Sequence, residues 1–62
     1  MHIILDTSSQ DMTFTGTVES LLLQLHINPE TVIVAKNGTL VQLDEVVQDT
    51  DTVHIMTVVS GG

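Results

Sequence analysis

The sequence predicts an α+β domain in which one main helix covers a mixed sheet of four to five strands, in the order β-β-α-β-β-β. Three observations lead to this expectation. The apolar residues are largely aliphatic or β-branched, with Phe14 as the single aromatic residue, which favours strands. One stretch beginning at Val18 has the periodicity of an amphipathic helix. Asn37-Gly38 is a strong hairpin signal, and 62 residues leave room for one small domain.

The chain is expected to open with a hairpin. Residues 1–6 form a short aliphatic run that ends in a polar cluster at residues 7–11. Residues 12–15 then alternate apolar with polar side chains, the pattern of a second strand. Gly16 breaks this strand.

The helix has recognisable ends. Thr17 is a suitable N-cap, and Glu19 in the first turn complements the helix dipole. One apolar face follows from the spacing i, i+3, i+4 and i+7 of Val18, Leu21, Leu22 and Leu25. The residue before a proline is disfavoured in a helix, so we expect the end of the helix at Asn28-Pro29. Leu23 points away from the apolar face.

Three further strands are expected. An unbroken β-branched run at residues 31–35 predicts the third strand, which enters the Asn37-Gly38 turn. The remaining elements are expected to be a short strand at Leu40-Val41, a helical turn at residues 43–47, a polar corner at residues 49–51 and a last strand from Thr52 to Val58.

The charge balance limits the partners. Eight acidic side chains accompany one basic residue, Lys36, for a formal net charge of −7. Such a field repels phosphate backbones and anionic lipids, so we expect neither nucleic acid nor a membrane as a partner. A basic docking surface is favoured instead, steered by Asp44, Glu45, Asp49 and Asp51. The alternative is that the acids only keep a small apolar protein soluble.

Several kinds of chemistry lack the residues they need. The chain has no cysteine, and the spacing of its three histidines matches no metal motif. We therefore expect no metal site. The serines and threonines of the chain have no recognisable base beside them, so we expect no catalytic triad either. No signal peptide or membrane-spanning run is visible, which predicts a cytoplasmic protein.

The last residues, Ser60-Gly61-Gly62, follow the final strand directly. Glycine lacks a Cβ atom and can pass through a narrow channel in another protein, so the candidate reactive group is the α-carboxylate of Gly62. Residues 1–59 are expected to form the domain and residues 60–62 a flexible tail. The alternative is a tail of small residues without a function.

Alternation along the last strand suggests a docking surface beside this tail. Val53 and Ile55 are expected in the core, which leaves Met56 and Val58 on the other face, with Ile33 or Leu40 nearby. Together with Val59, Met56 and Val58 are the candidate partner-binding residues. The alternative is that neighbouring strands cover them.

Features along the whole chain resemble the small sulfur carriers of the ubiquitin-like superfamily, the ThiS and MoaD carriers, which have the β-grasp fold. They are the helix at residues 18–25, Asn28-Pro29-Glu30-Thr31-Val32, Asn37-Gly38, Leu43-Asp44-Glu45, Asp51 and Ser60-Gly61-Gly62. Molybdopterin carriers usually have a proline pair before the terminal glycines. This chain has Val58-Val59-Ser60 there, which argues against that role.

The resemblance implies a chemistry for Gly62. A separate ATP-dependent adenylating enzyme would join its carboxylate to AMP, and a persulfide sulfur on a partner protein would displace AMP to leave a thiocarboxylate. The sulfur would then pass to a thiazole synthase in thiamine biosynthesis or to a tRNA thiolase that makes 2-thiouridine. The resemblance implies that the chain is not an enzyme and binds no cofactor, because ATP is used by the partner.

Two other functions remain open. A ubiquitin-like modifier would join Gly62 to lysines of target proteins, and Lys36 would then be the sole side chain able to accept a second copy. The simpler explanation of Lys36 is a solubilising residue at a hairpin. A plain interaction module with an inert tail is the third possibility.

Overall fold

The computed structural model of the chain describes residues 1–58. The elements are, in order, β1 (His2–Ile4), β2 (Ser9–Asp11), β3 (Gly16–Thr17), α1 (Val18–Gln24), the 3-10 turn η1 (Pro29–Thr31), β4 (Val32–Lys36), β5 (Thr39–Val41), β6 (Val46–Val47) and β7 (Thr52–Thr57).

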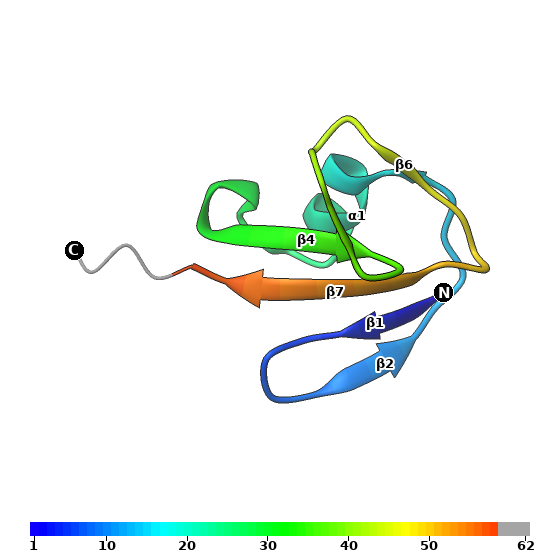
Figure 1. Cartoon of the computed structure of the whole chain (residues 1–62), viewed down its shortest axis with the longest axis horizontal. Helices are drawn as coiled ribbons and strands as arrows, with labels where there is room; N and C mark the ends of the chain where they lie inside the picture. The colour runs from blue at the N-terminus through cyan, green and yellow to red at the C-terminus, as the bar shows by residue number, and fades with distance from the viewer. Residues whose placement is uncertain (59–62) are drawn as a thin grey trace.

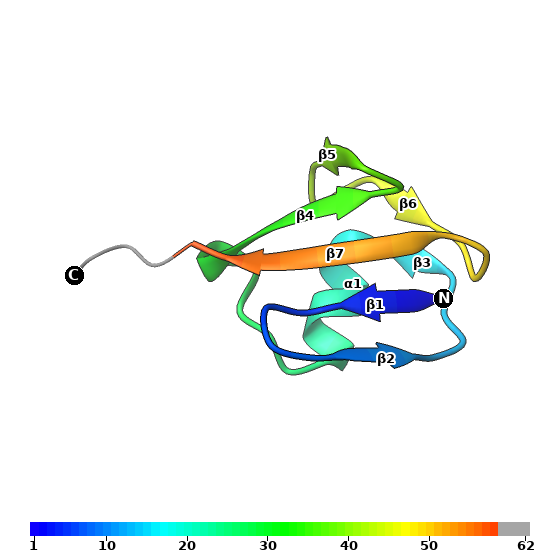
Figure 2. The same ribbon diagram turned by 60° about the horizontal axis from the view of Figure 1, so that its bottom comes forward.

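Five of the strands form one mixed sheet in the order β2-β1-β7-β4-β5 (Figure 2). β1 and β7 run parallel, and the other neighbours in this sheet are antiparallel. β3 and β6 make a separate antiparallel pair beside the helix. Helix α1 lies against one face of the large sheet (Figure 1). The predicted class, one helix on a mixed sheet with β-grasp architecture, is confirmed.

The core lies between α1 and the sheet. Val18, Leu21 and Leu22 of the helix are fully buried, as the apolar spacing predicted. They form one cluster with buried residues of the strands, namely Ile3, Val34, Val47, Val53 and Ile55. The inward orientation predicted for Val53 and Ile55 is therefore confirmed. Leu23 is 59% exposed, as its position off the apolar stripe implied.

The helix begins where the sequence indicated and ends earlier. The Thr17 side chain accepts a hydrogen bond from the backbone amide of Ser20 at 3.2 Å, so Thr17 is the N-cap. The helix stops at Gln24, well before Asn28-Pro29, because His26 takes a left-handed conformation with φ of 61°. The amides of His26 and Ile27 donate to the carbonyls of Leu23 and Leu22 in the last turn of the helix, which is the geometry of a Schellman motif.

The second strand of the first hairpin was placed wrongly. The return strand is β2, made of the polar residues Ser9–Asp11, and residues 12–15 are not a strand. The amide of Leu5 donates to the carbonyl of Ser8 at 2.7 Å and closes the turn early. This turn sets the register, with Ile4 opposite Ser9. Both faces of β2 are exposed, so no apolar alternation reveals it in the sequence.

The helical turn expected at residues 43–47 is also wrong. A turn at residues 43–44 leads into β6, which pairs with β3 so that Val47 lies opposite Gly16. Two backbone carbonyls before β6, those of Glu45 and Leu43, accept hydrogen bonds from the first amides of the helix, those of Val18 and Glu19. Gly16 thus lies in a short strand, where it was expected only to break one.

The turn between β4 and β5 follows the prediction. Asn37 and Gly38 both have positive φ, 51° and 89°. The side chain of Asn37 also ties this turn to the start of β7, because its Oδ1 accepts from the amide of Thr52 and its Nδ2 donates to Asp51, both at 3.0 Å. β4 begins at Val32, one residue later than expected, because Thr31 belongs to η1.

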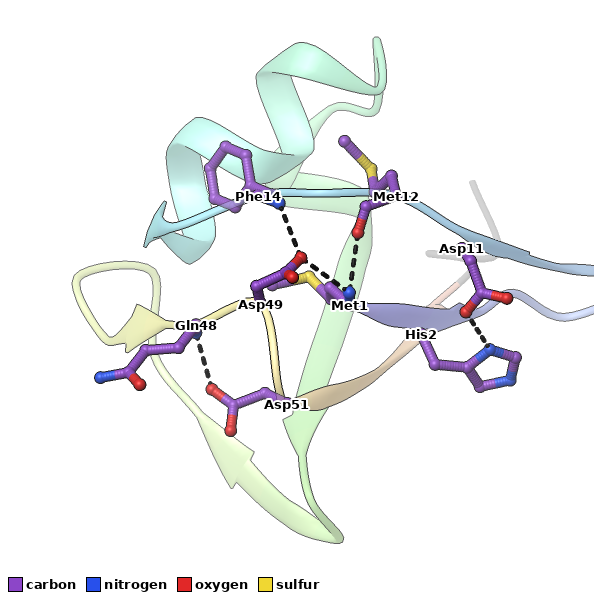
Figure 3. Close-up of polar contacts among 8 residues, drawn as sticks. All are labelled: Met1, His2, Asp11, Met12, Phe14, Gln48, Asp49 and Asp51. Atoms are coloured by element: carbon purple, nitrogen blue, oxygen red, sulfur yellow. Dashed lines mark hydrogen bonds and ion pairs between the residues drawn. The ribbon is translucent and has the colours of Figure 1, made fainter.

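A second polar cluster joins the amino end of the chain to the loop before β7 (Figure 3). The ammonium group of Met1 donates to the carbonyl of Met12 at 2.7 Å and to Oδ1 of Asp49 at 3.0 Å. The amide of Phe14 donates to the same Asp49 oxygen at 3.3 Å. One carboxylate therefore fixes the amino end of β1 and the segment that leads to the helix.

Candidate functional site

The central strand β7 positions the carboxyl end of the chain. It lies between β1 and β4 and ends at Thr57, at the opposite side of the molecule from Met1 (Figure 1). The predicted site residues Val59, Ser60, Gly61 and Gly62 lie outside the described residues, as does the boundary expected after residue 59. Within the described part, the site consists of the surroundings of the β7 end.

The face of the sheet opposite the helix carries apolar side chains next to the β7 end. Met56 pairs with Ile33, and Leu40 pairs with Ala35. The residues next to Ile33 and Met56, Val34 and Ile55, are buried, so Ile33 and Met56 themselves lie on the opposite face. Ile33 is 42% exposed, Val58 43% and Leu40 65%.

We call Ile33, Leu40, Met56 and Val58 the apolar outer face. Met56 is half-buried and the other three are exposed, so neighbouring strands do not cover this surface. The apolar outer face therefore extends from the end of β7 across the two strands on one side of it, β4 and β5. Ile33 and Leu40, which were expected near Met56 and Val58, both lie on this face. The role of Met56 and Val58 in binding a partner stays a prediction.

A hollow continues this surface toward the edge of the sheet. It has a volume of about 320 Å³ and shares Ile33 and Leu40 with the apolar outer face. Its other lining residues are Pro29, Val32, Val34, Val41, Gln42 and Leu43. Gln42 is the one polar side chain among these eight, so the hollow suits an apolar side chain of another protein.

A second hollow, of about 500 Å³, flanks the end of β7 on the other side. Its polar lining residues come from the β1–β2 turn, from η1 with its N-cap and from the end of β7, namely Asp6, Thr7, Ser8, Asn28, Thr31 and Thr57. Its apolar lining residues are Leu5, Ile27, Val32 and Ile55. The sequence analysis assigned no role to Asp6. Asp6 lies near Thr57 because β1 pairs with β7, although the two strands are far apart in sequence.

Two of the four acids that were expected to steer a partner, Asp49 and Asp51, make hydrogen bonds within the fold. The bond from the Met1 ammonium group holds the pKa of Asp49 below its ordinary value of 3.8, with help from the amide of Phe14. The amide of Gln48 donates to Asp51 at 2.7 Å and, with Asn37, lowers the pKa of that carboxyl (Figure 3). Both acids precede β7 and lie at the end of the strand far from Val58. Their steering role stays a prediction.

Lys36 is held by contacts within the chain. Its Nζ donates to Oε2 of Glu45 at 2.9 Å and to the carbonyl of Val46 at 3.3 Å. The hydrogen bond with Glu45 raises the pKa of Lys36 above its ordinary value of 10.5. These contacts tie the end of β4 to the segment at the start of β6. The role of Lys36 as an acceptor of a second copy stays a prediction.

No group of three histidine, aspartate or glutamate side chains between Met1 and Val58 could hold a metal ion. No helix in this range is long and apolar enough to cross a membrane.

Comparison with known proteins gives a consistent picture. The ThiS family model matches residues 4–62. The crystal structure of the thiamine biosynthesis protein (ThiS) from Geobacter metallireducens is similar over 100% of both chains, with a TM-score of 0.69 and 25% sequence identity. A comparison with curated proteins gave no match. Because the family model covers all but the first three residues, and the architecture agrees over the whole length, the chain belongs to the ThiS family.

Proposed function

We propose that this chain is a sulfur carrier and that the α-carboxylate of Gly62 is the group that receives the sulfur. The family match, which runs through residue 62, is the observation that carries the proposal. The fold supports it, because the central strand β7 ends at Thr57, next to Val58 of the apolar outer face.

The proposed chemistry has three steps. A carboxylate oxygen of Gly62 attacks the α-phosphorus of ATP on a partner enzyme, and pyrophosphate leaves. The terminal sulfur of a partner persulfide then attacks the acyl carbon, and AMP leaves. A partner thiol cleaves the resulting acyl disulfide, so that one sulfur remains on Gly62 as a thiocarboxylate and the thiol is oxidised to a disulfide.

The chain's own task in this scheme is presentation. The described residues include no base and nucleophile arranged for catalysis, so rate acceleration falls to the partner enzyme. The chain contributes a rigid β7, an apolar outer face for docking and a terminus whose glycines fit a narrow channel. It needs no cofactor of its own, since ATP binds to the partner.

We propose a thiazole synthase as the acceptor of the sulfur. The support is the name of the similar structure, which is that of a thiamine biosynthesis protein. A tRNA thiolase is the competing acceptor. Loading the carrier with sulfur and offering it to both enzymes in parallel distinguishes the two, because the cognate acceptor removes the sulfur from Gly62.

The direct test is adenylation. The chain is incubated with ATP, Mg²⁺ and the adenylating enzyme of its host, and pyrophosphate release is followed with the intact mass of the protein. We expect an acyl-adenylate and, with a persulfide donor and a thiol, exchange of one oxygen for sulfur on Gly62. A wild-type chain that gives neither product contradicts the proposal.

Tail variants make the test specific. Gly61→Leu introduces a bulky side chain and is expected to abolish adenylation without a change in melting temperature, whereas Gly61→Ala should reduce it less. Normal adenylation of Gly61→Leu would show that the tail does not enter a narrow channel. Peptides from the host in which Gly62 is joined to lysines of other proteins would instead support the modifier function.

A further inference from the structure

The end of β7 extends past its neighbour on one side. β1 pairs with β7 only as far as Ile4, which lies opposite His54, whereas β7 continues to Thr57. Successive backbone amides of a strand point to opposite neighbours, and the amide of Thr57 points to the side of β1. No backbone carbonyl of β1 is in register with it.

The side chain of Asp6 takes the place of that missing partner. Its Oδ2 accepts a hydrogen bond from the amide of Thr57 at 3.2 Å. Asp6 is held in position because the amide of Leu5 donates to the carbonyl of Ser8 at 2.7 Å and closes the turn around it.

The other side of β7 is held by η1. The amide of Val58 donates to the carbonyl of Thr31 at 2.8 Å. That carbonyl is presented by a tightly bonded turn, because Oδ1 of Asn28 accepts from the amide of Glu30 at 3.0 Å. The carbonyl of Asn28 also accepts from the amide and the hydroxyl of Thr31, at 3.1 and 2.9 Å.

We call the Asp6 carboxylate and the Thr31 carbonyl the β7 clamp. They hold two successive amides, of Thr57 and Val58, from opposite sides, and these are the last two residues before the terminal four. The rest of β7 is already fixed by the sheet. The clamp therefore extends the rigid part of the strand as far as Val58.

We propose that the β7 clamp is a positioning device for the reaction of Gly62, with Asp6 and the Asn28–Thr31 turn as its positioning residues. It fixes the point from which the terminal residues start relative to the apolar outer face. A carrier docked through that face then offers its carboxylate to the partner within a small volume, which lowers the entropic cost of the chemical step. This inference rests on the proposed function.

For the β7 clamp to form, residue 6 must accept a hydrogen bond from the amide of Thr57, and it need not carry a charge. Asp6→Asn keeps an acceptor oxygen, whereas Asp6→Ala removes it. Asp11→Ala is the matched control, since Asp11 is an exposed aspartate of the same hairpin that contacts His2 at the far end of β1.

The experiment measures adenylation kinetics and amide hydrogen exchange on the full chain, on these three variants and on Asn28→Ala. For Asp6→Ala we expect faster exchange at Thr57 and a kcat lower by about tenfold, with KM changed by less than about twofold. Asp6→Asn is expected to retain most of the wild-type kcat, and Asp11→Ala all of it. Asn28→Ala should accelerate exchange at Val58 and also lower kcat.

The outcomes separate the clamp from the proposed function. Unchanged exchange at Thr57 in Asp6→Ala overturns the clamp itself, and faster exchange with unchanged kcat overturns its positioning role. An Asp6→Asn variant as slow as Asp6→Ala shows that charge matters, not the hydrogen bond, and also overturns the proposal. If the wild-type chain is not adenylated at all, the proposed function fails and the positioning role falls with it, whatever the exchange data show.

Discussion

The amide of Val18, at the start of α1, donates a hydrogen bond at 2.9 Å to the carbonyl of Glu45, which lies in the segment just before β6. The amide of Glu19 donates to Leu43 at 3.0 Å in the same way. The first amides of a helix have no partners inside it. The loop that precedes β6 therefore caps the helix with backbone carbonyls, while the Thr17 side chain caps it at Ser20.

Substitutions of the two valines of β6, Val46 and Val47, test the placement of this strand. Val47 is fully buried in the core, whereas Val46 is 51% exposed. We expect Val47→Ala to lower the free energy of unfolding by about 2 kcal/mol through lost burial and a cavity. Val46→Ala is the matched control and should stay within about 0.5 kcal/mol of wild type. Equal losses in urea unfolding would mean that β6 does not dock as described.

The N-cap provides a second stability test. Thr17→Ala removes the acceptor for the amide of Ser20 and should lower the free energy of unfolding by about 1 kcal/mol. Thr13→Ala alters an exposed threonine outside the strands and the helix and serves as the control. Thermal unfolding followed by circular dichroism gives both values. A Thr17→Ala protein as stable as the control would show that the carbonyls before β6 suffice to cap the helix.

Two exposed leucines test the apolar outer face as a docking surface. Leu40 and Leu23 are 65% and 59% exposed, but Leu40 belongs to the outer face and Leu23 to the helix on the other side of the sheet. Leu40→Glu is expected to raise KM for adenylation by about tenfold or more, because a charge would enter a desolvated contact. Leu23→Glu should leave KM unchanged. Identical kinetics for the two variants would place the interface elsewhere.

Acid pH is expected to weaken the fold through Asp49 and Asp51. The pKa of each is lower in the folded chain than its ordinary value of 3.8, so the folded state binds fewer protons than the unfolded state in this range. Their stabilising contribution is complete above the unfolded pKa and is lost as the pH falls through the folded pKa.

Urea unfolding at a series of pH values measures this dependence. Asp51→Asn should reduce the slope of stability against pH below about pH 4. Asp44→Asn removes the same charge from an exposed turn and is the control. Wild type and Asp51→Asn with the same slope would contradict the assignment.

Local signals in the sequence were sufficient for several elements. Thr17, the apolar stripe of the helix and Asn37-Gly38 each act through near neighbours, and each was placed correctly. β7 was found because its alternation reflects one buried face. The family resemblance was confirmed by the match over residues 4–62.

Elements that depend on distant partners were missed. β2 is polar on both faces and is defined by the turn between Leu5 and Ser8. β6 exists because Val47 packs under the helix and pairs with Gly16. Asp6 acquires its contact with Thr57 only when β1 lies parallel to β7. None of these pairings leaves a local pattern, so the sequence alone does not reveal them.

The order of the strands has a consequence during synthesis. β7 is the last strand of the chain and yet the middle strand of the sheet, so β1 and β4 have no common neighbour until the ribosome has made it. A nascent chain that stops short of β7 lacks the strand that joins the two hairpins and stays exposed to proteases. Cells that make this protein would thus accumulate folded copies only from chains that are translated through β7.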